Sequence, residues 1–313
     1  STLSNKKTIS FTNGLFELKF TSIPLSSGGE NRKKEWIELN AYEYNEPIMC
    51  FSDTDMSHTS TNQLLGLSQY GPLDYSYIND SQPQRPIQLA LFSPKEHLTK
   101  IIGHLKNLNN SSKSNSKDKF LPDYAGFEKI YRRKLLIPNG DDPNLCITYP
   151  TKATEKLTIQ DFAAFIKRGI DRSAKNALNF DVMVIYIPAS FARFRETPDG
   201  SDDYNLHDSI KLYAADKGVS VQFIEERSTK PYDLCKVIWA LSASIYAKSQ
   251  GVLWHPKSIL DDTAYIGIGY SQSESKGICI GCSQLFDSTG TGIRMILKKI
   301  KNCLLYTSPS PRD

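Results

Sequence analysis

The stretch DVMVIYIP, residues 181–188, is the clearest candidate for a buried strand in this chain. A short, uninterrupted apolar run is typical of a strand covered on both faces of a parallel sheet. The segment NLHDSIKLYAADKG follows it and predicts a helix that Asn205 caps and Gly218 ends. VSVQFIEE, residues 219–226, then predicts another strand. This order of strand, helix and strand favours an open, largely parallel α/β sheet.

The same alternation extends in both directions. RPIQLALFSP, residues 85–94, predicts another buried strand, and residues 95–108 predict a helix. Further helices are predicted over residues 158–179 and 232–248, the second stopped by Gly251. The polar stretch 109–119 predicts a loop.

The pattern changes after residue 263. The sequence here predicts three consecutive strands separated by polar or glycine-containing turns: AYIGIGYS, KGICIGCSQLFDS and GIRMILKKI. Such a series predicts an antiparallel meander that opens a second domain. At the other end, residues 1–84 predict only short strands and loops.

Composition favours a cytoplasmic protein. The chain has 313 residues, a net charge of +4 and 39% hydrophobic residues. No apolar run approaches the roughly 18 residues of a membrane span, and the first residues lack the apolar stretch of a signal peptide. Six scattered cysteines suggest reduced thiols.

The basic residues are unevenly distributed. Residues 95–134 hold ten Lys/Arg against four Asp/Glu. This segment either attracts phosphate groups or forms an ordinary solvated surface with a polar loop, and the composition leaves both interpretations open.

The last residues, CLLYTSPSPRD at 303–313, have no hydrophobic period. They resemble the translation of a common sequencing adapter. We therefore exclude this segment from the fold prediction and expect the natural protein to continue differently after Asn302.

One set of side chains predicts an anion site. His207 and Lys211 are four residues apart on the predicted helix and share a face near its N-terminus, which favours anions. Gln222 lies on the following strand, and Lys248 closes the next helix. Charge from lysine and directed hydrogen bonds from histidine and glutamine suit a terminal phosphate. Each residue also has an ordinary alternative, since helical lysines are usually solvated and Gln222 could satisfy itself at a sheet edge.

Several segments resemble short prokaryotic Argonautes. Two segments are similar to parts of their MID domain: NLHDSIKLYAADKGVSVQFI and ALSASIYAKSQGVLWHP. Two upstream segments are similar to stretches that those proteins carry before and inside the MID domain: GLSQYGPLDYS and LPDYAGFEKIYRRKLLIP. AYIGIGYS and CSQLFDSTGTGI resemble the opening strands of their PIWI domain. The resemblance covers about residues 60–300 and implies a division of the chain. We expect an N-terminal strand and linker region (1–84), a Rossmann-like MID domain with a mostly parallel sheet (85–255), and the first antiparallel strands of an RNase H-like PIWI domain (256–302).

The resemblance assigns roles to the predicted anion site. In that family the MID domain holds the 5′-phosphate and first nucleotide of a guide strand. The matching positions here are His207, Lys211, Gln222 and Lys248. His207 stands where tyrosine is commoner, so we expect weaker base stacking. A Mg²⁺ ion at the guide 5′-phosphate is implied in the same way.

The predicted PIWI strands lack one catalytic group. Active members of the family place an aspartate in the first strand, because paired Mg²⁺ ions need carboxylate ligands. This sequence reads Ile266-Gly267-Ile268-Gly269, and Gly269 offers no ligand. Asp261 and Asp262 precede the strand, but the family pattern argues against them. CIGC, residues 279–282, is not expected to bind zinc, because residues three apart on a strand face opposite sides. We therefore expect no catalytic site and no protein metal site.

By resemblance, the chain is predicted to be the guide-binding subunit of a prokaryotic defence system. It would hold a small 5′-phosphorylated guide, RNA in preference to DNA, and pair it with complementary target DNA without cleavage. Recognition would be signalled to an APAZ-domain effector protein of the TIR or sirtuin type. Two alternatives stay open: a guide-directed endonuclease with carboxylates beyond Asn302, and a module that binds a phosphorylated metabolite.

Overall fold

The computed structural model describes residues 8–11, 16–19, 39–41, 46–77, 84–115, 120–154, 157–175, 180–194, 205–229, 231, 233–257, 263–273, 278–288, 290 and 292–301. The chain divides into two compact units, Ser1–Pro47 and Ile48–Asp313. The first unit contains an antiparallel sheet of β1 (Thr8–Phe11), β2 (Phe16–Lys19) and β3 (Leu39–Ala41). The predicted adapter segment 303–313 lies outside the described residues.

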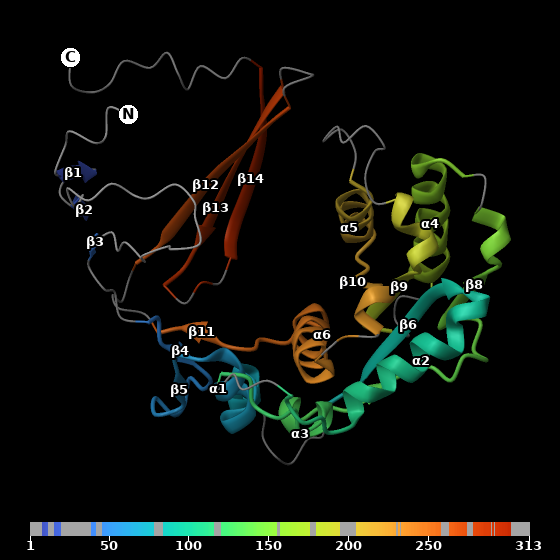
Figure 1. Cartoon of the computed structure of the whole chain (residues 1–313), viewed down its shortest axis with the longest axis horizontal. Coiled ribbons are helices and arrows are strands. Elements are labelled where there is room, and N and C mark those ends of the chain that lie inside the picture. Colours follow the sequence, from blue (N-terminus) through green and yellow to red (C-terminus); the bar gives the residue numbers. More distant parts are fainter. Residues whose placement is uncertain are drawn as a thin grey trace, which may run out of the picture. The chain divides into compact units, whose positions relative to one another are not determined.

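A five-stranded parallel sheet forms the centre of the second unit (Figure 1). Its strands are β6 (Ile87–Pro94), β7 (Leu135–Leu136), β8 (Cys146–Tyr149), β9 (Val182–Ile187) and β10 (Val221–Glu225). The order is β10-β9-β6-β7, and β8 also pairs with β6. Every pairing in this sheet is parallel, which confirms the predicted α/β fold. β10 is the edge strand.

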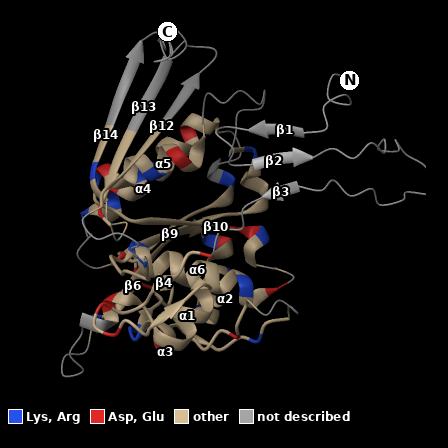
Figure 2. Cartoon of the chain, turned by 90° about the vertical axis from the view of Figure 1, so that its left-hand side faces the viewer, with Lys and Arg blue, Asp and Glu red and all other residues tan. Residues whose placement is uncertain are grey.

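Helices cover both faces of this sheet. In Figure 2, α4 (Ile159–Ala174) and α5 (Leu206–Asp216) lie on one side of it, and α2 (Leu98–Lys106) and α6 (Leu234–Lys248) on the other. Successive side chains of β9 enter two different cores, since Val184 packs with the α2 and α6 residues and Ile185 with those of α4 and α5. All six residues of β9 are at most 5% exposed. Burial on both faces explains the unbroken apolar run in its sequence.

Local signals set most helix boundaries. The side chain of Asn205 accepts a hydrogen bond from the Asp208 N–H, so it caps α5 as predicted. Gly218 follows α5 with φ +67°, a conformation that suits glycine at a helix end. Two predicted helices are shorter than expected. The first is interrupted by 3-10 turns, Lys95–His97 and Asn107–Asn109, on either side of α2. The second ends at Ala174, and residues 176–179 of the prediction lie outside the described residues.

A smaller sheet joins two segments that are far apart in the sequence. β4 (Met49–Cys50) pairs with both β5 (Thr59–Ser60) and β11 (His255–Pro256). The helix α1 (Gln63–Tyr70) contacts β5, and α3 (Phe127–Tyr131) contacts α1. Phe51 and Leu67 pack in the same core as Trp239 of α6. The segment following residue 48 therefore contributes to the core on the α6 face.

The predicted antiparallel meander is present. β12 (Tyr265–Ser273), β13 (Ile278–Phe286) and β14 (Gly292–Lys301) pair in that order. Within the part of the chain that the structure describes, no helix has the length and apolar character that crossing a membrane requires.

Two helical glycines provide a test of the packing. A Cβ at Gly169 of α4 would lie 2.4 Å from the Phe92 ring, whereas a Cβ at Gly103 of α2 would meet nothing within 4 Å. We expect Gly169→Ala to lower the free energy of unfolding by about 1–3 kcal/mol through overpacking. Gly103→Ala should instead raise it by up to about 1 kcal/mol, because alanine is the better helix former. Chemical denaturation of both variants measures the contrast, and equal effects would contradict this packing.

Candidate functional site

The carboxyl edge of an open parallel sheet is its usual ligand site. Here the protein's own carboxylates occupy two positions along that edge. Glu226 accepts a hydrogen bond from the Ala189 N–H (2.9 Å), at the turn that follows β9, and pairs with the Lys100 ammonium. Glu96 accepts hydrogen bonds from the Thr151 hydroxyl (2.9 Å) and N–H (3.4 Å), at the turn that follows β8. Anion positions at the middle of the edge are therefore filled internally.

A cluster of positively charged side chains lies instead at the edge strand β10. The Oε1 atom of Gln222 accepts hydrogen bonds from Ser244 Oγ (2.7 Å) and Lys248 Nζ (2.5 Å). Ser244 and Lys248 are one turn apart on α6 and so share a face. The Nε2 atom of Gln222 donates to the Phe223 carbonyl (2.8 Å). The bond between Gln222 and Lys248 joins β10 to the last turn of α6.

These contacts determine how the Gln222 amide is oriented. An amide oxygen has two acceptor sites, and both are taken by donors from α6. The opposite orientation would place the NH₂ group against the Lys248 ammonium and the Ser244 hydroxyl. One N–H of Nε2 is used by Phe223, and no contact of the described residues uses the other. Gln222 therefore offers a hydrogen-bond donor to a ligand.

Lys248 is held in an unfavourable environment for a charge. Burial, together with the positive charge of the nearby Lys211, lowers the pKa of Lys248 to about 8. Lys211 is exposed on α5, and neither lysine has a carboxylate partner among the described residues. A half-buried ammonium group beside a second positive charge attracts an anion, because the anion offsets both the repulsion between the charges and the cost of burying one of them.

His207 lies on the other side of the edge strand. Its ring packs against Phe223, with centroids 4.9 Å apart and planes tilted by 49°, and its Nδ1 is 3.2 Å from Asp208 Oδ1. Phe223 and Gln222 are adjacent in β10, so their side chains point to opposite faces. Of the four predicted residues, the structure brings Gln222, Lys248 and the charge of Lys211 together. His207 approaches the same strand from the α5 face.

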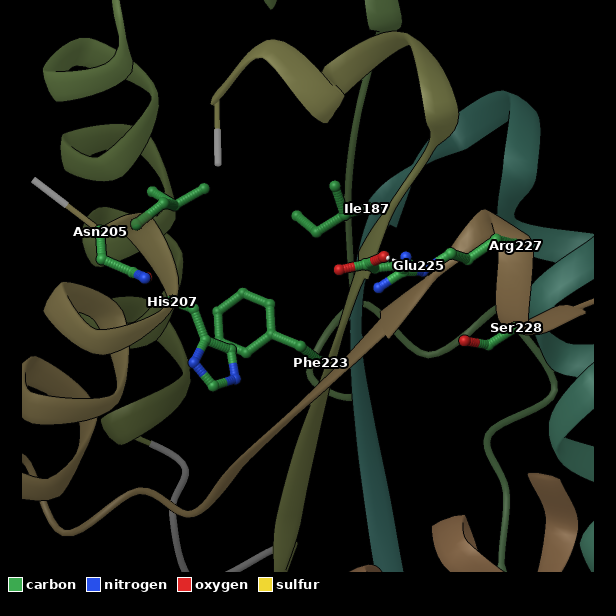
Figure 3. A pocket seen from close by; sticks show the side chains of 8 residues that line it. Ile187, Asn205, His207, Phe223, Glu225, Arg227 and Ser228 are labelled. Carbon is green, nitrogen blue, oxygen red and sulfur yellow. Dashed lines mark ion pairs between the residues drawn. The ribbon is translucent and has the colours of Figure 1, made fainter. Parts of the chain in front are cut away.

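Cavities border this strand on both faces. One, of about 300 Å³, lies between the start of α5 and the ends of β9 and β10 (Figure 3). Its lining residues are Ile187, Asn205, Leu206, His207, Phe223, Glu225, Arg227 and Ser228. The other, of about 350 Å³, lies against α6 and includes Gln222 and Ser244 in its walls. Phe223 and Ser228 line both cavities, so the two are neighbours around the edge of the sheet.

The sequence-based prediction did not identify four residues of this region: Phe223, Glu225, Arg227 and Ser244. The strand pattern could have placed Phe223 and Glu225 on one face, because they are two residues apart. Ser244 stands four residues before Lys248, a spacing that puts it on the same face of the helix. Neither spacing indicates which partner the side chain meets.

The described residues supply no metal centre. No group of three or more His, Cys, Asp or Glu side chains is placed to hold a metal ion in the described part of the chain. Gly269 lies exposed in β12 and pairs in register with Cys282 of β13. A Cβ at Gly269 would meet nothing within 4 Å, so packing does not require glycine there. Asp261 and Asp262 lie outside the described residues.

The environment of Lys248 predicts a stability effect. The pKa of Lys248 in the folded protein, about 8, lies below the value of about 10.4 in an unfolded chain, so protonation at neutral pH opposes folding. We expect Lys248→Met to raise the free energy of unfolding at pH 7 by about 1–2 kcal/mol. The gain should shrink as the pH rises from 8 to 10.5, because the folded protein then sheds this cost by losing the proton.

Lys236→Met is the matched control, since Lys236 is an exposed lysine on the same helix. Denaturation curves at pH 7 and pH 10 measure the effect. A Lys248→Met variant that is less stable than the native chain at pH 7 would contradict the proposed cost of this charge.

No protein-family model matches the chain, and no curated protein matches it in sequence. The solved structure of Aa-Ago with externally bound siRNA matches with a TM-score of 0.50 at 16% identity, over 85% of this chain and 33% of that chain.

Two further matches are Aquifex aeolicus Argonaute (TM-score 0.47, 16% identity, 86% of this chain and 34% of that one) and Marinitoga piezophila Argonaute with a 5′ OH guide RNA and target DNA (0.43, 13%, 81% and 33%). The chain spans about a third of the length of the solved Argonautes that it matches. At this identity the likeness to Aa-Ago concerns the fold alone, and the chain has an Argonaute-like α/β fold.

Proposed function

We propose that this chain anchors a small guide strand by its 5′-phosphate, so that the strand can recognise complementary target DNA. The observation that carries the proposal is the half-buried Lys248, bonded to Gln222 beside the charge of Lys211 and without a carboxylate partner among the described residues. A half-buried lysine with a lowered pKa, which the fold keeps at a cost in stability, is a candidate functional residue.

A terminal phosphate suits this cluster better than a phosphate within a chain. A terminal group carries up to two negative charges and three unesterified oxygens, whereas an internal phosphodiester carries one charge. Lys211 and Lys248 would supply the charge, and the second N–H of Gln222 a directed hydrogen bond. His207, in the first turn of α5, would add the favourable end of a helix dipole.

The surroundings support a nucleotide strand as the ligand. The cavity beside His207 and Phe223, about 300 Å³, has room for a sugar and a base next to the phosphate. The tilted His207 and Phe223 rings offer a stacking surface for that base. The Argonaute-like fold is compatible with the same assignment, and Aa-Ago was solved with an externally bound siRNA. We propose RNA as the preferred guide and DNA as the alternative.

A phosphorylated metabolite is the second candidate ligand. The same cavity has room for a mononucleotide, and the anion cluster would hold its phosphate equally well. The two proposals differ in whether the nucleotides after the first one add to the affinity.

We also propose that the chain does not cleave the target. Gly269 stands in β12 where the resemblance places the first catalytic carboxylate, and glycine offers a metal no ligand. The resemblance further suggests that a bound target is signalled to an APAZ-domain effector of the TIR or sirtuin type in antiviral defence. A nuclease with carboxylates beyond Asn302 is the competing proposal.

The described residues do not favour Mg²⁺ at the phosphate. Gln222 Oε1 already accepts two donors, and the nearby Lys211 and Lys248 repel a cation. A Mg²⁺ ion would depend on phosphate and water oxygens, so we propose anchoring that does not require it.

The first test compares two labelled RNAs of identical sequence, one with a 5′-phosphate and one with a 5′-hydroxyl, at fixed salt. We expect the phosphate to tighten binding by about 10- to 100-fold, the usual worth of hydrogen bonds to a charged group. Lys211→Ala and Lys248→Met should remove most of that difference, while the control Lys236→Ala should keep it. EDTA should leave the difference unchanged.

Two results would contradict this proposal. Equal affinity for both RNAs, falling steeply with salt, would indicate only non-specific attraction to basic surface. Equal affinity for the 5′-phosphorylated RNA and for its first nucleotide alone would indicate the metabolite module.

The cleavage proposal has its own test. We expect no guide-directed cutting of complementary DNA in Mg²⁺, because the position of Gly269 lacks a carboxylate. Gly269→Asp should fold with unchanged stability, within about 0.5 kcal/mol, since no atom lies within 4 Å of the added Cβ. Gel analysis of labelled target and thermal unfolding measure both results, and specific cleavage by the native sequence would refute the proposal.

A further inference from the structure

The cavity beside His207 has a charged wall that anchoring a phosphate does not use. Glu225 is the last residue of β10, and Arg227 follows in the next turn. The Arg227 Nε and Glu225 Oε2 atoms form an ion pair at 2.7 Å. Figure 3 shows both side chains on the wall opposite the His207 ring, with the Glu225 carboxylate directed toward the cavity.

This wall is unsuited to a phosphate. The Glu225 side chain is only 25% exposed, so its charge is weakly screened and would repel a phosphodiester placed in the cavity. The Arg227 side chain is 75% exposed and balances that charge from the solvent side. Such a half-exposed pair contributes little to stability. A neutral, planar group that can both donate and accept hydrogen bonds fits the wall, and a nucleobase edge is such a group.

The pair has a definite hydrogen-bonding pattern. The Glu225 carboxylate accepts hydrogen bonds, and the neighbouring Arg227 guanidinium donates them. The Watson–Crick edge of guanine presents the O6 acceptor next to two donors, N1–H and the N2 amino group. Uracil presents a single donor between two acceptors, so one of its acceptor oxygens would face the carboxylate. Adenine and cytosine each offer one amino group. Guanine can therefore make the largest number of favourable contacts with this pair.

We propose that Glu225 and Arg227 are specificity-determining residues that read the first base of the anchored strand and favour guanine. The base would stack on the His207 and Phe223 rings while its edge meets the ion pair. This inference rests on the proposed 5′-phosphate anchoring and adds the identity of the first nucleotide.

The test uses the full chain and four 5′-phosphorylated RNAs that differ only in their first nucleotide, each with a 5′-hydroxyl counterpart. We expect the guanine strand to bind about tenfold more tightly than the uracil strand, the discrimination expected of a good paired contact to a base edge. Glu225→Gln and Arg227→Ala should each reduce this preference to about twofold or less, while the ratio of 5′-phosphate to 5′-hydroxyl affinity stays that of the native chain.

Asp216→Asn is the matched control, because it makes the same carboxylate-to-amide change on an exposed side chain at the far end of α5. Thermal unfolding of every variant checks its folding. Arg227 is exposed and lies in the turn after β10, so Arg227→Ala leaves the strand itself unaltered. Equal affinity for all four strands, a preference for another base, or a guanine preference that survives both substitutions would overturn the inference. In each case an intact 5′-phosphate preference would leave the proposed anchoring standing, whereas its loss from the native chain would remove both.

Discussion

The site depends on one interaction, the hydrogen bond between the Lys248 ammonium and the Gln222 amide oxygen. It joins the last turn of α6 to the edge strand β10 and keeps a charge half-buried next to the charge of Lys211. A positive charge in such a position costs stability unless an anion accompanies it. The same bond, with that from Ser244, directs the Gln222 donor outward. Charge and hydrogen-bond direction are thus set by the same few atoms.

The sheet also explains why the site lies at its edge. The turns after β8 and β9 would ordinarily present backbone donors to a ligand at the middle of the carboxyl edge. Here Glu96 and Glu226 occupy those positions with internal carboxylates, and Glu226 is further held by Lys100. An incoming phosphate would meet negative charge there. At β10 the balance is reversed, since Lys211 and Lys248 have no acidic partner among the described residues and cavities open on both sides of the strand.

Much of the architecture could be predicted because its signals are local. The apolar run of β9 reflects burial on both faces, and the cap at Asn205 and the stop at Gly218 are read from single residues. The spacing of His207 and Lys211 places them on one helical face. Helix lengths were less predictable, since α4 ends at Ala174 and 3-10 turns flank α2. The packing of Phe51 and Leu67 with Trp239 had no local signal, because the partners are far apart in the sequence.

The sequence by itself determined the residue types that the chemistry needs: two lysines, a glutamine and a histidine at helical and strand spacings, and a glycine in place of a carboxylate at position 269. Tertiary structure decided how they act. It placed Gln222 on the α6 face and His207 on the α5 face of one strand, lowered the pKa of Lys248, and set Glu225 and Arg227 along the cavity wall. These properties arise from burial and from contacts between distant segments, and neither is encoded in the spacing of residues along the chain.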